Sequence, residues 1–308
     1  MRYRTFIFDS ARWSGFESRA GDIIISTPPK CGTTWMQNIV AMLVLGTSEF
    51  DRPMAQLSPW LDQNLRPVAS VLADLESTSH RRFIKSHTPL DGLPWRDDIT
   101  YVVVGRDARD VAMSWQHHWD NMDLERVMAL RREAVGLDDL SELPAMPPPI
   151  TDPTERFWRW MTDRATSPEF ATGLEFLVIH LRSFWERRHE RNVVMVHFAD
   201  LCADLSGEMR RLAGRLGVHV DEQHWPELVS AASFGSMSAR ADALAPNAGQ
   251  IWRDTNAFFH TGSSGQWRAV AGQDGNRRYQ EIIRTLSNDE AFLAWLHRGD
   301  GTNEKAER

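Results

Sequence analysis

The stretch DIIISTPPKCGTTW, residues 22–35, decides the fold of this chain. Its first part, residues 22–27, is a short run rich in β-branched residues, which is typical of a strand buried on both faces of a parallel sheet. Over residues 33–45 the apolar side chains recur at helical spacing. A buried strand, a glycine-containing turn and a helix in this order predict the opening unit of an α/β fold.

The same alternation continues along the chain. The sequence predicts further strands over 82–85, 100–104 and 193–198, and helices over 108–119, 173–191 and 204–216. This order predicts an open, central parallel β-sheet with helices on both faces. We expect a single domain over residues 1–308, with ligands bound in the loops where the strands end.

Three segments depart from this pattern. Residues 120–172 are expected to form a cap over the substrate, and they include the proline-rich run 143–153, which is either a surface connection or a mobile lid. Residues 233–265 have a loop-like composition. Residues 299–308 are polar and are expected to form a flexible tail.

Composition excludes several classes of function. The 308 residues carry a net charge of −7, so no overall positive field favours nucleic acid or an anionic membrane. The longest apolar run, residues 39–45, is far shorter than the roughly 20 residues that span a bilayer. The two cysteines give no disulfide framework. These features predict a cytoplasmic protein without an integral membrane segment and without a nucleic-acid partner.

The loop after the first predicted strand has the composition of an anion site. N–H groups at a helix N-terminus attract anions. Lys30 adds a full positive charge, and Thr33 and Thr34 add hydroxyl donors. The order differs from the Walker A motif, because Lys30 precedes Gly32 instead of following it. The alternative is a strand–helix turn whose threonines only cap the helix.

A second strand end carries Lys85 and His87. Two residues apart on a strand, these side chains point to the same side of the sheet. The pair suits a general base with a positive charge beside it. A solvated strand end gives the same pattern, so this segment alone does not decide between the two interpretations.

A third strand end carries Arg106, and Ser114 follows it by about two helical turns. An arginine and a hydroxyl that converge on one point suit a phosphate monoester. We expect Asp107 and Asp110, in the same segment, to cap the helix or to pair with neighbouring arginines.

Together these segments resemble the cytosolic-type sulfotransferases, the family that uses 3′-phosphoadenosine 5′-phosphosulfate (PAPS). The family's phosphosulfate loop PKSGTTW is matched by PKCGTTW at 29–35, its K-x-H by KSH at 85–87, and its 3′-phosphate motif by GRDARDVAMS at 105–114. Its R-K-G-x-x-G-x-W motif is similar to HTGSSGQW at 260–267. The segment LSPWLD at 57–62 is closer to actinobacterial members, including glycolipid sulfotransferases, than to animal ones.

The resemblance implies the sulfotransferase fold, a P-loop-like parallel sheet flanked by helices. It implies in-line transfer of a sulfuryl group from PAPS to a hydroxyl of a lipophilic alcohol, phenol or glycolipid, with release of 3′-phosphoadenosine 5′-phosphate (PAP). His87 would take the acceptor's proton, Lys30 would stabilise the leaving phosphate oxygen, and Lys85 the sulfuryl oxygens. This mechanism requires no metal, and the sequence contains no recognisable metal-ligand set.

The resemblance also implies a donor site and an acceptor pocket. The implied donor-binding residues are Lys30, Cys31, Gly32, Thr33, Thr34, Trp35, Arg106, Ser114, Phe198, Phe234, His260, Thr261 and Gly262. The implied acceptor-pocket residues are Phe16, Trp60, His118 and Trp119. Trp35 and Phe234 would enclose the adenine, and Phe198 stands where many members have a tyrosine.

Two departures from the family pattern concern the donor. Cys31 replaces a serine, so a hydroxyl becomes a weak thiol donor, or the residue is simply small and buried. His260 and Thr261 replace Arg-Lys, which removes two permanent charges from the expected 3′-phosphate site. The groups left to hold that phosphate are Arg106, Ser114, the N–H groups near Gly262 and a protonated His260. The animal dimer motif is absent, so the oligomeric state stays open.

Two other functions remain open from the sequence. A P-loop-like nucleotide kinase would use the same strand–loop–helix unit. A non-catalytic module that binds PAP or PAPS would keep the fold and lose turnover. The altered motif at Gly262 favours this module, whereas the presence of Lys30, Lys85 and His87 argues against it.

Overall fold

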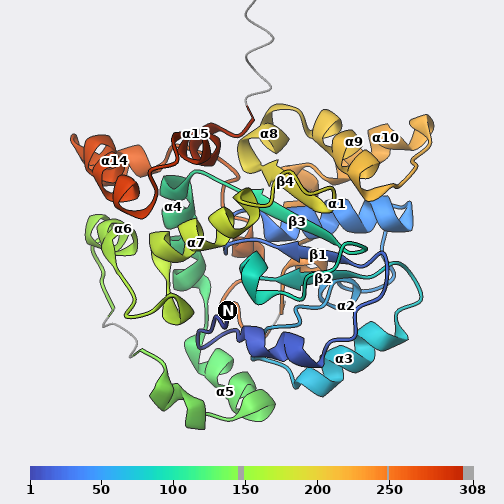
Figure 1. Ribbon diagram of the computed structural model, residues 1–308, viewed down its shortest axis with the longest axis horizontal. Coiled ribbons are helices and arrows are strands. Elements are labelled where there is room, and N and C mark those ends of the chain that lie inside the picture. Colours follow the sequence, from blue (N-terminus) through green and yellow to red (C-terminus); the bar gives the residue numbers. More distant parts are fainter. Residues whose placement is uncertain (145–148, 248–249, 301–308) are drawn as a thin grey trace, which may run out of the picture.

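A computed structural model describes residues 1–144, 149–247 and 250–300 and confirms the predicted α/β fold. A central parallel sheet has the strand order β2–β1–β3–β4. Its strands are β1 (Ile23–Ser26), β2 (Phe83–Ser86), β3 (Thr100–Gly105) and β4 (Val193–His197). Figure 1 shows the sheet in the middle of the molecule, with helices on either side.

Alternating side chains of the strands supply two separate apolar cores. In β1 the side chain of Ile24 packs into one core, whereas Ile23 and Ile25 pack into the other. All three are fully buried, as a strand covered on both faces requires. The strand rich in β-branched residues is therefore the centre of the fold.

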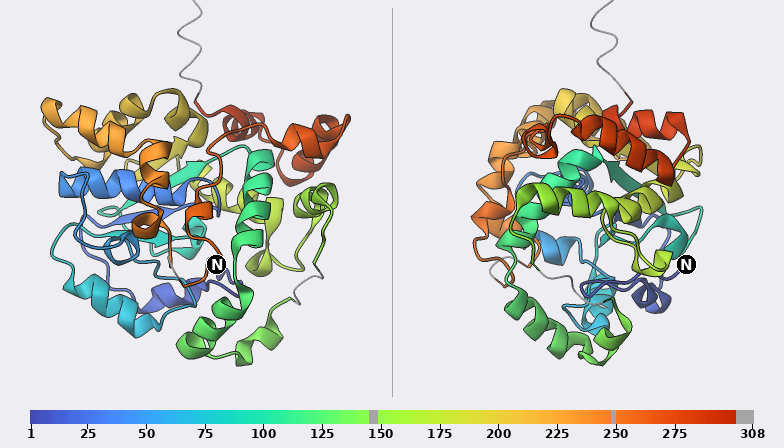
Figure 2. Two further views of the ribbon diagram at one scale, coloured as in Figure 1. Left: turned by 180° about the vertical axis from the view of Figure 1, so that it is seen from behind. Right: turned by 90° about the vertical axis from the view of Figure 1, so that its left-hand side faces the viewer.

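Helices cover both faces of the sheet (Figures 1 and 2). The core that holds Ile23 and Ile25 is closed by α1 (Thr33–Leu45), α2 (Met54–Leu57), α8 (Phe198–Ala203), α9 (Leu205–Leu216), α10 (Trp225–Ala231), α11 (Phe234–Ser238) and α12 (Ala241–Leu244). The core that holds Ile24 is closed by α3 (Val68–Ser77), α4 (Ala108–Asn121), α6 (Pro153–Thr162), α7 (Gly173–Trp185), α13 (Trp267–Ala271), α14 (Gly275–Leu286) and α15 (Glu290–Arg298).

Short 3₁₀ helices complete the described structure. They are η1 (Ser10–Gly15), η2 (Leu90–Gly92), η3 (Asp138–Glu142), η4 (Pro168–Phe170), η5 (Glu222–His224) and η6 (Asn256–Phe258). The expected cap, residues 120–172, contains α5 (Leu124–Val135), η3, α6 and η4. Helix α5 lies apart from the sheet, near the N-terminus (Figure 1). Part of the proline-rich run and nearly all of the expected tail lie outside the described residues.

Two predictions of secondary structure are wrong, the end of one helix and one segment predicted as loop. The helix predicted over 173–191 ends at Trp185, where the guanidinium of Arg188 donates to the Trp185 carbonyl (2.7 Å) and occupies an acceptor at the end of the helix. The segment 233–265, predicted as loop, contains α11, α12 and η6. Helix α11 begins because the Ser233 hydroxyl accepts a hydrogen bond from the N–H of Ser236 (3.3 Å).

Within the described part of the chain, no helix combines the length and the apolar character that crossing a membrane requires. The feature that positions a site is the edge where β1, β2 and β3 end. There the N-terminus of α1 meets the residues that follow each strand, as expected for an open α/β sheet.

Candidate active site

The loop between β1 and α1 has the backbone of an anion cradle. Lys30 and Gly32 both have positive φ, 70° and 108°, and Gly32 is the N-cap of α1. Because a left-handed conformation costs a residue with a side chain roughly 1–2 kcal/mol, Lys30 is held there by its surroundings. A Cβ on Gly32 would also lie 3.3 Å from the ring of Phe198. The first-turn N–H groups of α1 have no acceptors within the helix and face this loop.

The other predicted residues of this loop are buried. Thr33 and Thr34 are each 7% exposed, and the Thr33 hydroxyl hydrogen-bonds that of Thr27. Cys31 is fully buried, its N–H donates to the Pro28 carbonyl (3.3 Å), and burial raises the pKa of its thiol to about 12. The thiol therefore stays protonated, and its burial fits the interpretation of Cys31 as a small buried residue.

Lys85 and His87, at the end of β2, both contact one indole ring, that of Trp60. The Lys85 ammonium lies 3.9 Å from the centre of the Trp60 ring, and the His87 ring lies edge-on to the same ring at 4.7 Å. His87 Nδ1 hydrogen-bonds the carbonyl of Thr27, the residue after β1 (2.6 Å). The expectation that both side chains lie on one side of the sheet is therefore met, with Trp60 beside them.

Asp62, to which no role was assigned from the sequence, organises this cluster. Its buried carboxylate accepts hydrogen bonds from the Trp60 indole, from the Ser86 and Thr88 hydroxyls (2.5 Å each) and from the Trp13 indole (3.2 Å). It thereby fixes Trp60 and the two residues that flank His87. An acidic residue inside the apolar segment 57–62 was the available signal, because a buried carboxylate needs partners.

Lys30 joins the cluster from the loop. Its ammonium lies 3.1 Å from His118 Nδ1 and 4.9 Å from the centre of the Phe258 ring. The chain contains only three lysines, Lys30, Lys85 and Lys305. All other residues of the Lys and Arg set are arginines. The use of lysine at two strand ends was therefore a further signal of a functional site in the sequence.

Burial sets the protonation of the cluster. Desolvation, with some help from Arg106, lowers the pKa of Lys30 to about 7. Desolvation also lowers the pKa of Lys85 to about 7, although the Asp62 charge opposes it. Burial and the charge of Lys85 hold the pKa of His87 well below its usual range. The site therefore combines a neutral imidazole with two amines that titrate near neutrality.

Arg106 connects this cluster to the C-terminal motif. Its guanidinium donates to the carbonyls of Lys30 (3.2 Å) and Ser263 (3.4 Å) and lies 4.1 Å from the centre of the Phe198 ring. Its buried Nε has no partner among the described residues. An arginine with an unpartnered buried N–H at a strand end fits the predicted anion contact. Ser114, two turns further along, is half-buried on α4.

The segment 260–265 packs along α4, between His117 and Asp110. His260 stacks on His117 of α4, with ring centres 3.7 Å apart, and Thr261 accepts hydrogen bonds from Ser263 and Gln266. Asp110 accepts a hydrogen bond from the N–H of Gly265 (2.6 Å). Asp107 and Asp110 were expected to cap the helix or to pair with arginines. Asp107 caps α4 and pairs with Arg109, whereas Asp110 lies in the first turn, where its charge acts on Arg106. His117 was missed by the sequence analysis.

The expected adenine residues lie around this loop. The Trp35 indole donates to the Ala232 carbonyl (2.8 Å), and its ring meets Phe198 edge-on at 5.3 Å. Phe234 is 40% exposed, and a Cβ on Gly262 would come within 2.6 Å of it. Phe198 thus packs between Trp35 and Arg106, while Phe234 stands at the surface.

The expected acceptor residues are only partly brought together. Trp60 and His118 contact the catalytic cluster, and Trp119 packs against Phe6 and Trp115. The ring of Phe16 contacts other residues than Lys85 and His87. It packs on Trp13 and on Arg82, which precedes β2, whereas Lys85 and His87 stand where that strand ends.

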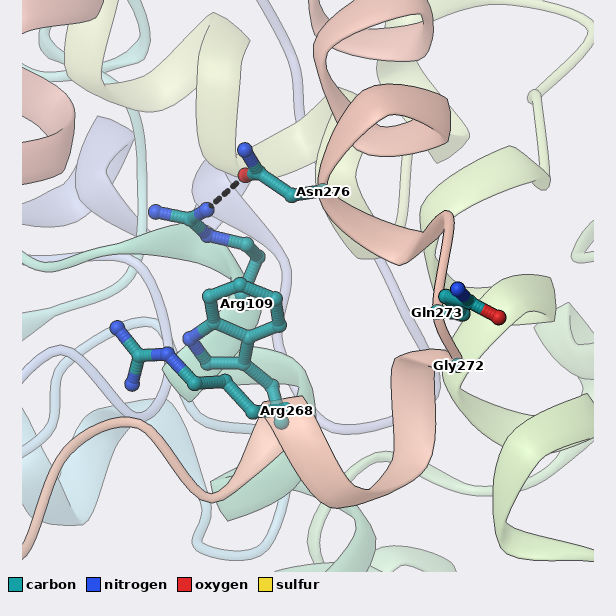
Figure 3. A pocket seen from close by; sticks show the side chains of 6 residues that line it. Arg109, Arg268, Gly272, Gln273 and Asn276 are labelled. Carbon is teal, nitrogen blue, oxygen red and sulfur yellow. Dashed lines mark hydrogen bonds between the residues drawn. The ribbon is translucent and has the colours of Figure 1, made fainter.

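A pocket of about 420 Å³ lies outside this cluster (Figure 3). Arg109 and Arg268 line it, but Arg109 is already bound to Asp107 and Asn276 and Arg268 donates to the Gly265 carbonyl. No group of three or more His, Cys, Asp or Glu side chains that could hold a metal ion occurs in the described ranges.

The sequence matches the model of the sulfotransferase domain over residues 20–297. It is 38% identical over 313 residues to a glycolipid sulfotransferase of Mycobacterium bovis (strain BCG / Pasteur 1173P2), covering 96% of this chain and 94% of that protein. It is 27% identical over 240 residues to sulfotransferase 1B1 of Mus musculus, covering 75% and 70%. The structure is similar to retinol dehydratase crystallised with retinol and PAP, with a TM-score of 0.67 and 19% identity over 91% and 85% of the chains. The predicted likeness to actinobacterial members is confirmed, and the chain belongs to the sulfotransferase domain family.

Proposed function

We propose that this protein transfers a sulfuryl group from PAPS to a hydroxyl of a lipophilic acceptor and releases PAP. The hydrogen bond between His87 and Thr27 carries this proposal. A carbonyl oxygen can only accept, so the ring hydrogen sits on Nδ1 and Nε2 keeps a free lone pair. His87 is thereby set in the tautomer that a general base needs.

Burial keeps this base neutral. The lowered pKa of His87 leaves it unprotonated near neutral pH, ready to accept a proton. In the transfer, a bond forms between the acceptor oxygen and sulfur while the bond from sulfur to the phosphate oxygen breaks. His87 receives the hydroxyl proton at Nε2.

Lys30 and Lys85 supply the positive charge for this displacement. Lys30 stabilises the charge that develops on the leaving phosphate oxygen, and Lys85 the charge on the sulfuryl oxygens. Such contacts are strongest where water is excluded, and Lys85 is only 4% exposed. Their amines are charged below a pKa of about 7, and a bound anion favours the charged form at higher pH as well.

The donor nucleotide is assigned to the loop and to α4. The α1 N-terminus at Gly32–Thr34 suits the phosphosulfate, because its N–H groups face the loop. Arg106, Ser114 and the 260–262 turn suit the 3′-phosphate. Trp35, Phe198 and Phe234 offer aromatic surface to the adenine. PAP in the retinol dehydratase crystal fits this assignment, since that protein has a similar fold.

The acceptor is assigned to the aromatic side of the cluster. Trp60 stands against His87, and Trp252 and Phe258 pack around His118. These rings favour an apolar molecule that presents one hydroxyl, and the mycobacterial relative is named for glycolipids. Segment 120–172 would cover such an acceptor. Both cysteines are free thiols, which fits action in the reducing cytoplasm.

The test is a transfer assay with ³⁵S-labelled PAPS. Lipid extracts, simple phenols and water-soluble sugars would be offered side by side, with the His87→Ala variant as control. We expect label in the lipid fraction with the wild type and at least 100-fold less with the variant. Equal labelling by both proteins would remove His87 from the mechanism.

Two companion measurements distinguish the other two functions from sulfuryl transfer. A kinase would transfer the γ-phosphate of ATP in the presence of Mg²⁺ and leave PAPS intact. A binding module would bind PAP, measured by calorimetry, and would transfer nothing to any of the three acceptor classes.

A further inference from the structure

The hydrogen-bond partner of the Lys30 amine is His118. Lys30 Nζ lies 3.1 Å from His118 Nδ1, closer than it lies to the Phe258 ring centre at 4.9 Å. The imidazole is itself enclosed by aromatic rings, with centres 4.8 Å away for Trp252, 5.7 Å for Trp115 and 6.1 Å for Phe258. This enclosure leaves the imidazole little freedom, so Nδ1 is a fixed acceptor.

The protonation states define the direction of this hydrogen bond. Burial and the charge of Lys30 hold the pKa of His118 well below its usual range, so the ring is neutral. The amine therefore donates and Nδ1 accepts, with the ring hydrogen on Nε2. An ammonium has three hydrogens, so the remaining ones stay available to an anion.

Both ends of the Lys30 side chain are consequently held. Its backbone has φ of 70°, and its carbonyl accepts from Arg106 (3.2 Å). Its amine is held by His118. A free lysine side chain has many rotamers, and fixing both ends selects the few that keep the amine beside His118 of α4.

We propose that His118 is a positioning residue that acts through Lys30: it holds the amine where the leaving phosphate oxygen gains charge. The resemblance to the family placed His118 in the acceptor pocket instead. This inference rests on the proposed function, in which Lys30 stabilises that oxygen.

The first test needs neither donor nor turnover. NMR titration of isotopically labelled lysine is simple here, because the chain has three lysines and the K30A variant identifies one signal. His118→Phe keeps a ring but removes the acceptor, so we expect the pKa of Lys30 to fall. Arg106, Lys85 and His87 also face this pair and are unchanged in the variant. His118→Asn places an oxygen near the position of Nδ1 and should restore the wild-type titration.

The second test is a double-mutant cycle. We expect His118→Phe to lower kcat by roughly 10- to 100-fold, the loss typical of a misplaced catalytic group, with a small change in KM for the acceptor. In a K30A background the same substitution should cost almost nothing. Because the charged amine is the active form, the alkaline limb of the pH profile should move to lower pH in H118F and return in H118N.

Three outcomes would overturn the inference: an unchanged Lys30 titration in H118F, a full effect of H118F in the K30A background, or a change confined to acceptor KM. If H118F does not fold, H118L removes the same acceptor with less bulk. A wild type that neither binds PAP nor transfers sulfuryl groups would instead refute the proposed function, and the NMR titration would still test the contact.

Discussion

The catalytic cluster and the 260–265 segment are joined by one side chain, Arg106, and yet they are built in opposite ways. Lys85 and His87 are 4% and 6% exposed and stand at a strand end. His260, Thr261 and their neighbours are exposed and stand on a turn. In the buried cluster charges act at low dielectric, so each substitution has a large effect. In the exposed turn water screens the charges, so the replacement of the family's Arg-Lys by His260 and Thr261 reduces the affinity for the nucleotide less.

The largest effect is expected at the buried end. His87→Ala should lower kcat by ~10²–10⁴, because general-base catalysis is lost. PAP affinity, measured by calorimetry, should barely change, since His87 faces the acceptor. A variant that binds PAP tenfold more weakly would show that the two regions are not separate.

The second effect concerns the pH dependence of PAP binding. Burial lowers the pKa values of Lys30 and Lys85 to about 7, and a bound anion raises them, so binding of PAP takes up protons. Affinity should therefore be highest below pH 7 and fall above it, by up to about tenfold per pH unit for each proton taken up. Calorimetry in buffers of different ionisation enthalpy counts these protons at pH 8.

A Lys85→Met variant is the matched control for that titration. It should take up fewer protons than the wild type at pH 8, where phosphates with a second pKa of about 6 are already fully ionised. Identical uptake by both proteins would mean that Lys85 does not respond to the nucleotide.

The third effect is expected at the junction of the two regions. Arg106→Ala removes a charge-assisted contact worth ~1.5–3 kcal/mol, so PAP should bind at least tenfold more weakly. Adenosine 5′-phosphate, which lacks the 3′-phosphate, should bind equally to both proteins. Equal weakening of the two nucleotides would show that Arg106 only holds the loop through the Lys30 and Ser263 carbonyls.

The smallest effect is expected at the exposed end. Burial lowers the pKa of His117, and the stacked His260 lowers it further. Asp120 and Arg156 also face His117, with opposite charges. A bound 3′-phosphate favours the charged form of His117, so His117→Gln should cost PAP affinity a few-fold at pH 5.5 and nothing at pH 8.5. Parallel profiles over that range would mean that His117 only packs on His260.

The sequence predicted best what local pattern controls. Helix α1 begins and ends where predicted, because its boundaries follow from an apolar repeat between two glycines. Lys30, Lys85 and His87 were found because the ends of parallel strands meet at one edge. The short helices after residue 233 were missed, since helices of four or five residues have too few turns for a repeat.

Roles that depend on distant partners could not be predicted. Asp62 is defined by donors from three segments, at Trp13, Trp60 and Ser86–Thr88. On α4, His117 and His118 are adjacent in sequence. His117 stacks on His260 and His118 hydrogen-bonds Lys30, and this difference depends on the residues packed around each ring. The place of Phe16 in the acceptor pocket stays a prediction, because the contacts of its ring with Trp13 and Arg82 depend on how η1 packs.

The scarcity of lysine makes this protein an unusual target for reagents that modify primary amines. Of 35 basic residues only Lys30, Lys85 and Lys305 carry primary amines, together with the N-terminus. Because the first two have pKa values of about 7, their amines are largely uncharged and nucleophilic at mildly alkaline pH. Coupling the protein to a sensor surface through its amines would therefore modify the catalytic lysines themselves. A small aldehyde that reaches the cluster would label Lys30 and Lys85 and few other groups.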